Sequence, residues 1–301
     1  MKTSVVLCTY NGEKYIKDQI YSILNQTQEV DEIIINDDGS TDKTNELIKS
    51  IAEKQKFIKY YINKKNIGFI NNFAEGIKKT NGDLVFFSDQ DDIWLPNKVE
   101  RIVCEFKKNS NINVVFTNAS ILNSNIKNLW SNYNYDFNHK ICSEILKRDF
   151  VTGATMCCKR NFLVKYLPIP NQIYHDRWFA LAAALTGTLH PIDENLIKYR
   201  VHEDQKIGLK KSGYFKQKLN EKNVFLNQIT IIDSLFSMTS IDDIPIGNKI
   251  LFENKKLFYL NRLNLNGNIL KRIFRCSNMI KSYILYSSGI PSYLKDIIFR
   301  R

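Results

Sequence analysis

Three carboxylates lie within four positions of the chain, directly after the apolar run at 83–88: Asp89, Asp91 and Asp92. Crowded carboxylates repel one another unless a positive charge offsets them. Hard divalent cations such as Mg²⁺ and Mn²⁺ take oxygen ligands, and Mg²⁺ commonly uses one or two carboxylates together with water and substrate phosphates. The charge of the ion would relieve the repulsion. The trio therefore predicts a divalent-cation site, with helix capping and surface charge as the alternative.

A second acidic segment, DDGSTD at 37–42, follows another apolar run. Asp-Gly-Ser is turn chemistry, and Ser40 or Thr41 could cap a helix that follows. A carboxylate at the carboxyl end of a strand could instead accept hydrogen bonds from ribose hydroxyls or from a base N–H group. The choice between these interpretations depends on where the surrounding elements place the segment.

The first 105 residues alternate between helical patterns and four short apolar runs, at 4–9, 32–36, 57–62 and 83–88. This alternation predicts an α/β fold, a mostly parallel sheet with helices on both faces. In such sheets ligands bind beyond the carboxyl ends of the strands. The loops that follow the four runs are polar and partly acidic, and we expect them at one edge of the sheet: 9–13, 37–42, 63–68 and 89–92.

The chain beyond residue 105 is less regular and then turns helical. The patterns predict strands at 113–118, 152–158 and 196–202, and a buried helix at 176–185 with Asp176 placed to cap it. After residue 205 they predict a helical extension, with helices at 214–236, 246–263 and 268–286 that Pro245 and Gly247 interrupt.

Composition and charge indicate the cellular compartment and the partners that we expect for this protein. No apolar stretch approaches the ~18–20 residues that span a bilayer, and the apolar run at the start is too short for a signal peptide. The six scattered cysteines lack the spacing of a zinc or redox pair, so we expect idle thiols in the cytoplasm. The net charge is +12, and residues 206–301 hold 17 Lys and Arg against 6 Asp and Glu. This basic region predicts an anionic partner surface, either a membrane or nucleic acid.

Three segments in order, at 4–27, 31–44 and 66–100, make the chain resemble family 2 glycosyltransferases. The segments at 175–187 and 196–208 are similar to the rhamnosyltransferase-like branch, which builds bacterial surface polysaccharides such as capsule or O-antigen. The resemblance implies the GT-A fold and a nucleotide-diphospho-sugar donor, either dTDP-rhamnose or a UDP-sugar. It also implies Mn²⁺ or Mg²⁺ as the cofactor.

The resemblance also assigns roles by position. Thr9, Tyr10 and Glu13 match the loop that lies against the base and ribose, and Asp38 (or Asp37) matches the carboxylate that reads the base. Asp89 matches the residue near the ribose, and Asp91 matches the ligand of the metal that bridges the diphosphate. Asp92 is expected to touch the donor sugar or to cap the next helix.

Two further residues match later motifs of the family. Asp176, in the pair His175–Asp176, matches the general base of inverting members, which accepts the proton of the attacking hydroxyl. His202 matches a histidine that approaches the metal or diphosphate. His139, His175 and His190 are expected to be structural, and TGATM at 152–156 either shapes the acceptor pocket or forms plain strand and turn.

The resulting hypothesis is a metal-dependent inverting hexosyltransferase with a catalytic domain at 1–205. Residues 1–105 would bind the donor, residues 106–205 the acceptor, and the basic region at 206–301 an anionic membrane. We expect a polyprenyl-linked glycan acceptor, a location at the inner face of the bacterial membrane, and no nucleic-acid partner. One alternative is a sugar nucleotidyltransferase, which should carry a Gly-rich phosphate loop where TYNGEKY has one glycine. The other is a non-enzymatic nucleic-acid binder, whose phosphates the acidic loops would repel.

Overall fold

The computed structural model describes the chain except residues 123–128, 130–136, 203–204, 206–220, 266–268 and 299–301. The chain forms two compact units. The first contains residues 1–134, 151–180 and 188–213, and the second contains residues 135–150, 181–187 and 214–301. The predicted boundary at 205–206 stays a prediction, since it adjoins residues outside the described ranges.

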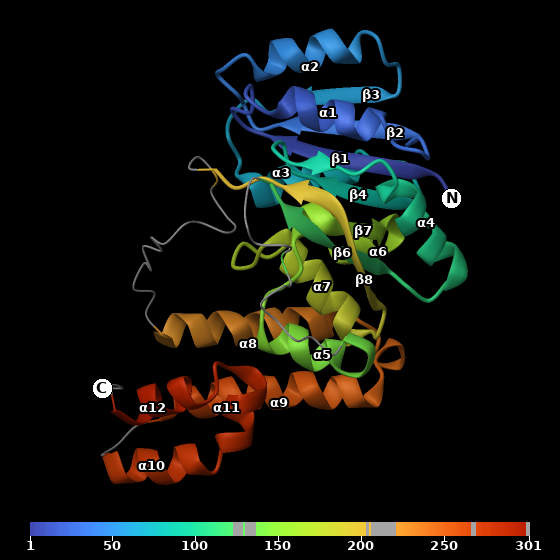
Figure 1. Ribbon diagram of the computed structural model, residues 1–301. Coiled ribbons are helices and arrows are strands. Elements are labelled where there is room, and N and C mark those ends of the chain that lie inside the picture. Colours follow the sequence, from blue (N-terminus) through green and yellow to red (C-terminus); the bar gives the residue numbers. More distant parts are fainter. Residues whose placement is uncertain (123–128, 130–136, 203–204, 206–220, 266–268, 299–301) are drawn as a thin grey trace. The chain divides into compact units, whose positions relative to one another are not determined.

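The first unit is built on a mixed sheet of eight strands in the order β3-β2-β1-β4-β7-β6-β8-β5 (Figure 1). The strands are β1 (Thr3–Thr9), β2 (Glu32–Asp37), β3 (Ile58–Ile62), β4 (Leu84–Ser88), β5 (Ile93–Trp94), β6 (Val114–Ile121), β7 (Met156–Lys159) and β8 (Leu189–Tyr199). The pairs β1/β2, β2/β3, β1/β4 and β6/β8 are parallel, whereas β7 runs antiparallel to β4 and β6, and β5 to β8. The predicted mostly parallel sheet is confirmed.

Helices cover both faces of the sheet because successive side chains of a strand point to opposite faces. Val5 and Leu7 of β1 share one buried cluster with residues of α1 (Ile16–Leu24), α2 (Thr44–Ala52) and α4 (Lys98–Lys108). On the other face α3 (Phe69–Lys78) approaches β1 so closely that a Cβ on Gly76 would lie 2.6 Å from a methyl group of Val6. Two more helices, α6 (Arg160–Lys165) and α7 (His175–Leu185), follow later in the chain.

The second unit is helical, as the sequence predicts. It contains α5 (Phe137–Lys147), α8 (Glu221–Met238), α9 (Ile246–Leu263), α10 (Ile269–Ser277), α11 (Ile280–Tyr286) and α12 (Ile290–Ile298). No helix among the described residues has the length and apolar character needed to cross a bilayer. None of the six cysteines, all of which lie in the described part of the chain, forms a disulfide.

Four local predictions are wrong. Residues 153–155 form a short 3₁₀ turn before β7, not a strand, and Asp176 lies inside the first turn of α7 instead of capping it. Gly247 lies within α9, so only Pro245 marks a helix boundary. The single helix predicted at 268–286 is two helices, since α10 ends at Ser277 and α11 begins at Ile280. The early part of the predicted helix at 214–236 lies outside the described residues.

A buried ion pair holds the helices of the second unit together. Arg262 of α9 donates two hydrogen bonds to the Asp296 carboxylate of α12, from Nε at 2.6 Å and from Nη2 at 2.9 Å. Tyr283 of α11 donates to the same carboxylate at 2.5 Å. The guanidinium also lies over the rings of Phe225 and Phe258, so helices α8, α9, α11 and α12 meet at one charge pair.

Substitution of Asp296 with asparagine is expected to lower the free energy of unfolding by about 3–5 kcal/mol, because it leaves the buried guanidinium uncompensated. Urea denaturation followed by circular dichroism measures the change. Asp233→Asn is the matched control, since Asp233 pairs with Lys256 at the surface, where an ion pair contributes up to about 1 kcal/mol. Equal losses in the two variants would contradict a structural role for the buried pair.

Candidate active site

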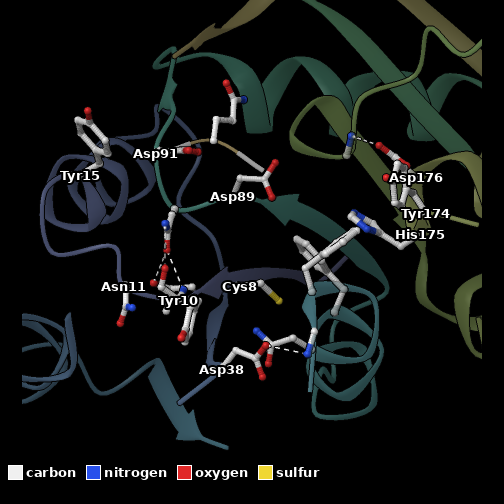
Figure 2. A pocket seen from close by; sticks show the side chains of 18 of the residues that line it. Cys8, Tyr10, Asn11, Tyr15, Asp38, Asp89, Asp91, Tyr174, His175 and Asp176 are labelled. Atoms are coloured by element: carbon white, nitrogen blue, oxygen red, sulfur yellow. Dashed lines mark hydrogen bonds between the residues drawn. The ribbon is translucent and has the colours of Figure 1, made fainter. Parts of the chain in front are cut away.

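A cavity of about 510 Å³ opens at the carboxyl ends of β1, β2 and β4, within the first unit (Figure 2). The parallel register brings these ends together, since Thr9 pairs with Asp37 and Leu7 with Ser88. Seven of the residues assigned from the sequence line the cavity: Thr9, Tyr10, Asp38, Asp89, Asp91, Asp176 and His202. The acidic loops therefore meet at one sheet edge.

Gln90 holds the loop after β1 against the loop after β4. Its side-chain oxygen accepts hydrogen bonds from the Thr9 hydroxyl at 2.7 Å and from the Tyr10 backbone N–H at 2.8 Å. The loop after β1 is also tied to the loop after β2, because Asn11 accepts from the Thr41 N–H and donates its own N–H to Ser40. Thr9 thus lines the cavity while its hydroxyl proton is engaged with Gln90.

The two adjacent carboxylates after β2 have different partners. Asp37 is buried and accepts hydrogen bonds from the backbone N–H groups of Gly39 and Ser40, so it stabilises its own turn. Asp38 faces the cavity and accepts from the N–H groups of Ile67 and Gly68, at 2.8 and 2.9 Å, and from the Asn63 amide. The choice of Asp38 over Asp37 as the residue at the cavity agrees with this geometry.

The three carboxylates after β4 also separate. Figure 2 shows Asp89 between Asp91 and Asp176, all three at the cavity. Withdrawal from bulk solvent, with the nearby charges of Asp91 and Asp176, raises the pKa of Asp89 to about 7. Asp92 is fully buried and accepts the backbone N–H of Arg200 at 2.9 Å. Burial, together with the other two carboxylates, raises its pKa well above the ordinary value.

Two residues predicted to contact the nucleotide-sugar donor are not among the described residues that line the cavity. Asp92 is turned toward Arg200, as above, and Glu13 is exposed and accepts the backbone N–H of Lys43 at 2.9 Å. Contact of either residue with the donor stays a prediction.

Asp91 is paired with His202. Its Oδ2 lies 2.7 Å from Nε2 of the histidine, whose ring is 4.9 Å from the ring of Tyr15. Arg200 donates from Nε to the backbone oxygen of Asp91 at 2.7 Å and places its guanidinium over Tyr15. The chain after β8 therefore fixes both the backbone and the side chain of the predicted metal ligand.

A divalent cation fits these residues. Among the described residues, no three His, Cys, Asp or Glu side chains are grouped as a complete metal cage. Asp91 and Asp89 nevertheless supply hard oxygen donors at the cavity, and a cation there would offset the burial and the like charges that raise the pKa of Asp89. This is the chemistry of a Mg²⁺ or Mn²⁺ ion that completes its shell with water and substrate phosphates.

The opposite wall of the cavity carries Asp176. Its carboxylate accepts the backbone N–H of Gly153 at 3.1 Å and that of Arg177 at 2.7 Å, so the 3₁₀ turn orients it. Burial raises its pKa above the ordinary value despite these bonds. A carboxylate with a raised pKa is a better proton acceptor near neutral pH. Its place in the cavity and its raised pKa are compatible with the expected general base, and that role stays a prediction.

A buried lysine contacts the turn that orients Asp176. Lys98 of α4 is fully buried, donates from Nζ to the backbone oxygen of Ala154 at 2.6 Å, and lies 3.9 Å from the centre of the Trp94 ring. Burial lowers its pKa to about 7, although Asp92 and Asp89 oppose that shift. Lys98 therefore links α4 to the turn that orients Asp176.

Sequence reasoning missed several residues of the cavity. His175, expected to be structural, lines it as a buried ring stacked on Phe73 at 4.0 Å and on Phe87 at 5.4 Å. Burial lowers the pKa of His175 to about 3, so the ring is neutral. Other missed lining residues are Asn11, Tyr15, Asn66, Asn72, Gln90 and Tyr174. Asn11, Asn66 and Gln90 carried a signal in the sequence, since they lie in the polar loops expected at the sheet edge.

Comparisons with known proteins agree with this geometry. Residues 4–169 match the family model described as glycosyl transferase family 2. An uncharacterized glycosyltransferase of Haemophilus influenzae is 31% identical over 283 residues, which cover 87% of this chain and 86% of the relative. The dTDP-rhamnosyl transferase RfbG of Shigella flexneri is 28% identical over 276 residues, covering 81% of this chain and 91% of the relative.

Solved structures show the same fold at low sequence identity. TarS of Staphylococcus aureus in complex with UDP is 17% identical, with a TM-score of 0.62 over 87% of this chain and 71% of that protein. The mannosyltransferase PcManGT of Pyrobaculum calidifontis, in complex with GDP-Man and Mn²⁺, is 14% identical, with a TM-score of 0.55 over 97% and 78%. The expected GT-A fold is confirmed. Sheet, acidic edge and family model agree, and the chain belongs to glycosyl transferase family 2.

Proposed function

We propose that this glycosyltransferase is a metal-dependent inverting enzyme that moves a sugar from a nucleotide-diphospho-sugar to a hydroxyl group. The observation that carries the proposal is the single cavity lined by Asp38, Asp89 and Asp91 on the nucleotide side and by Asp176 on the other. Family membership favours sugar transfer over nucleotidyl transfer and over nucleic-acid binding.

In the proposed reaction, the acceptor hydroxyl oxygen forms a bond to the anomeric carbon while the bond from that carbon to the diphosphate oxygen breaks. Asp176 accepts the hydroxyl proton. Asp38 binds the base or ribose beside Thr9 and Tyr10, and Asp89 lies near the ribose. Asp91, with His202 beside it, would hold Mn²⁺ or Mg²⁺, and such an ion would supply positive charge to offset the charge that grows on the leaving diphosphate.

The substrates are proposed from the relatives. RfbG is named a dTDP-rhamnosyl transferase, which supports dTDP-rhamnose as donor, and TarS binds UDP, which keeps a UDP-sugar open. We propose a polyprenyl-linked glycan as acceptor, in the synthesis of a bacterial surface polysaccharide such as capsule or O-antigen. The enzyme would then work in the cytoplasm at the inner face of the cell membrane.

A panel of donors tests the proposal. The purified protein is incubated with dTDP-rhamnose and with UDP-hexoses, with Mn²⁺ or with EDTA, and release of the nucleoside diphosphate is measured. We expect slow hydrolysis of one donor class in the presence of Mn²⁺ and background hydrolysis with EDTA, because water can replace the acceptor. Equal release with EDTA would contradict the metal requirement. Failure to bind any nucleotide sugar by calorimetry would contradict the proposed function.

A further inference from the structure

Two neighbouring helices of the second unit leave large apolar side chains uncovered. On α10 these are Leu270, Ile273 and Phe274, and the exposed fractions of Leu270 and Phe274 are 71% and 70%. Their i, i+3, i+4 spacing puts them on one side of the helix, while Cys276 on another side is buried. On α12, Ile290, Leu294 and Ile298 are exposed at intervals of four residues, and Ile297 is buried.

Helices α10 and α12 are neighbours in the second unit. They pack against each other, and the Ser277 hydroxyl of α10 lies 3.2 Å from the Tyr293 hydroxyl of α12. We call the six exposed side chains the apolar helix surface: Leu270, Ile273, Phe274, Ile290, Leu294 and Ile298. Large apolar side chains exposed together on neighbouring helices favour an interaction site, whereas scattered single ones do not.

The charges around the apolar helix surface are almost all positive. Residues 269–298 contain Lys271, Arg272, Arg275, Lys281 and Lys295, and their one acidic residue is Asp296. Asp296 is fully buried and bonded to Arg262, so it does not offset the surface charge. The described residues of α10–α12 therefore present cations beside exposed aliphatic and aromatic groups.

This combination selects among possible partners. A second copy of the chain would bring the same cations face to face, which like-charge repulsion opposes. A nucleic acid would neutralise the cations but would leave the aliphatic side chains in water. An anionic bilayer satisfies both, because headgroups attract the cations and the acyl boundary takes up the apolar side chains.

We propose that α10 and α12 dock the protein on an anionic lipid bilayer, with the apolar helix surface inserted at the acyl boundary. The inference deepens the proposed function and rests on it for its purpose, since a membrane would present a lipid-linked acceptor. Vesicle binding itself needs no donor sugar, so the two proposals can fail separately.

The test uses point substitutions in the full chain. Deletion of residues 268–301 is unsuitable, because it removes the buried Tyr283 and Asp296. The test variant is Leu270→Ser with Phe274→Ser. The matched control is Ile246→Ser with Ile250→Ser on α9, where the exposed fractions are 79% and 50%. Circular dichroism melting confirms that each variant folds.

Each protein is sedimented with vesicles of phosphatidylglycerol and phosphatidylcholine in equal amounts, and with vesicles of phosphatidylcholine alone. We expect the wild type and the control to bind the anionic vesicles, and the test variant to bind at least about tenfold more weakly. High salt and pure phosphatidylcholine should also weaken wild-type binding several-fold.

Three outcomes would overturn the proposal. They are absence of wild-type binding to anionic vesicles, equal binding by the folded test variant, and equal binding to the uncharged vesicles. Sedimentation velocity would also detect self-association. If the wild type and the control self-associate and the test variant does not, the apolar helix surface is a contact between copies of the chain instead. A wild type that binds vesicles but no nucleotide sugar would leave this inference standing and remove the proposed function.

Discussion

Replacement of Asp91 with asparagine is expected to reduce sugar transfer about a thousandfold while leaving the fold intact. The change keeps the shape of the side chain but removes the negative charge that would hold a divalent cation beside the diphosphate. Lewis-acid stabilisation of the leaving group contributes several kcal/mol, and each ~1.4 kcal/mol is tenfold in rate. Donor turnover at saturating Mn²⁺ and calorimetric Mn²⁺ binding with the nucleoside diphosphate present would both be measured.

Asp83→Asn is the matched control for that experiment. Asp83 lies just before β4, at the end of that strand opposite to the cavity. Its carboxylate accepts the backbone N–H of Lys2 at 2.8 Å. We expect the control to turn over donor at the wild-type rate. Unchanged turnover in Asp91→Asn would remove Asp91 from the proposed metal site.

Replacement of Asp176 with asparagine is expected to slow transfer about 10²–10⁴-fold, which is the usual contribution of a positioned general base. Asparagine can keep a hydrogen bond from the Gly153 N–H but cannot take up the proton of the attacking hydroxyl. Donor affinity should change little, since the residue lies on the wall away from Asp38. Transfer rate and donor binding are therefore measured separately.

The pH dependence gives an independent readout of the same residue. A base acts in its ionised form, and burial raises the pKa of Asp176 above its ordinary value. The wild-type transfer rate should be highest at pH values above that raised pKa and should fall as the pH drops through it. The Asp176→Asn variant should lack this acidic limb, whereas Asp193→Asn in β8 should retain it. An acidic limb shared by all three proteins would assign it to another group.

The sequence predicts the first half of the fold well because the parallel strands are short, continuous apolar runs. Loops that follow such runs must meet at one edge, so the neighbourhood of Asp38 and Asp89 could be inferred without coordinates. The turn at 153–155 could not. It reads as a strand, yet Lys98, which is distant in sequence, donates to its Ala154 oxygen and the Asp176 carboxylate accepts its Gly153 N–H. Only tertiary contacts decide such a segment.

The candidate site, like the fold, could be predicted only in part. Residue type and position after a strand predict which carboxylates can reach the cavity, but not which hydrogen bonds they already make. Asp92 is adjacent to Asp91 and is chemically identical, yet the backbone N–H of Arg200 holds it in the core. His175 is next to Asp176 in the sequence, yet its place in the wall is set by stacking on Phe73 of α3 and Phe87 of β4. Packing partners of this kind are invisible to a local pattern.

The order of the cavity residues along the chain has a consequence for engineering. The residues proposed to contact the nucleotide lie within residues 9–91, and the Gly153 turn and Asp176 lie within residues 152–176. Tyr199, His202 and Gln205 add to the lining from the last part of β8 and the chain after it. The main-chain joint between the first two of these segments is the antiparallel pairing of β4 with β7, where Phe86 faces Cys157. A chimera that takes residues 150–180 from a relative, and keeps the backbone pairing at that joint, would exchange one wall of the cavity and preserve the other. Under the proposed function, such a chimera is expected to change acceptor preference while donor preference stays the same.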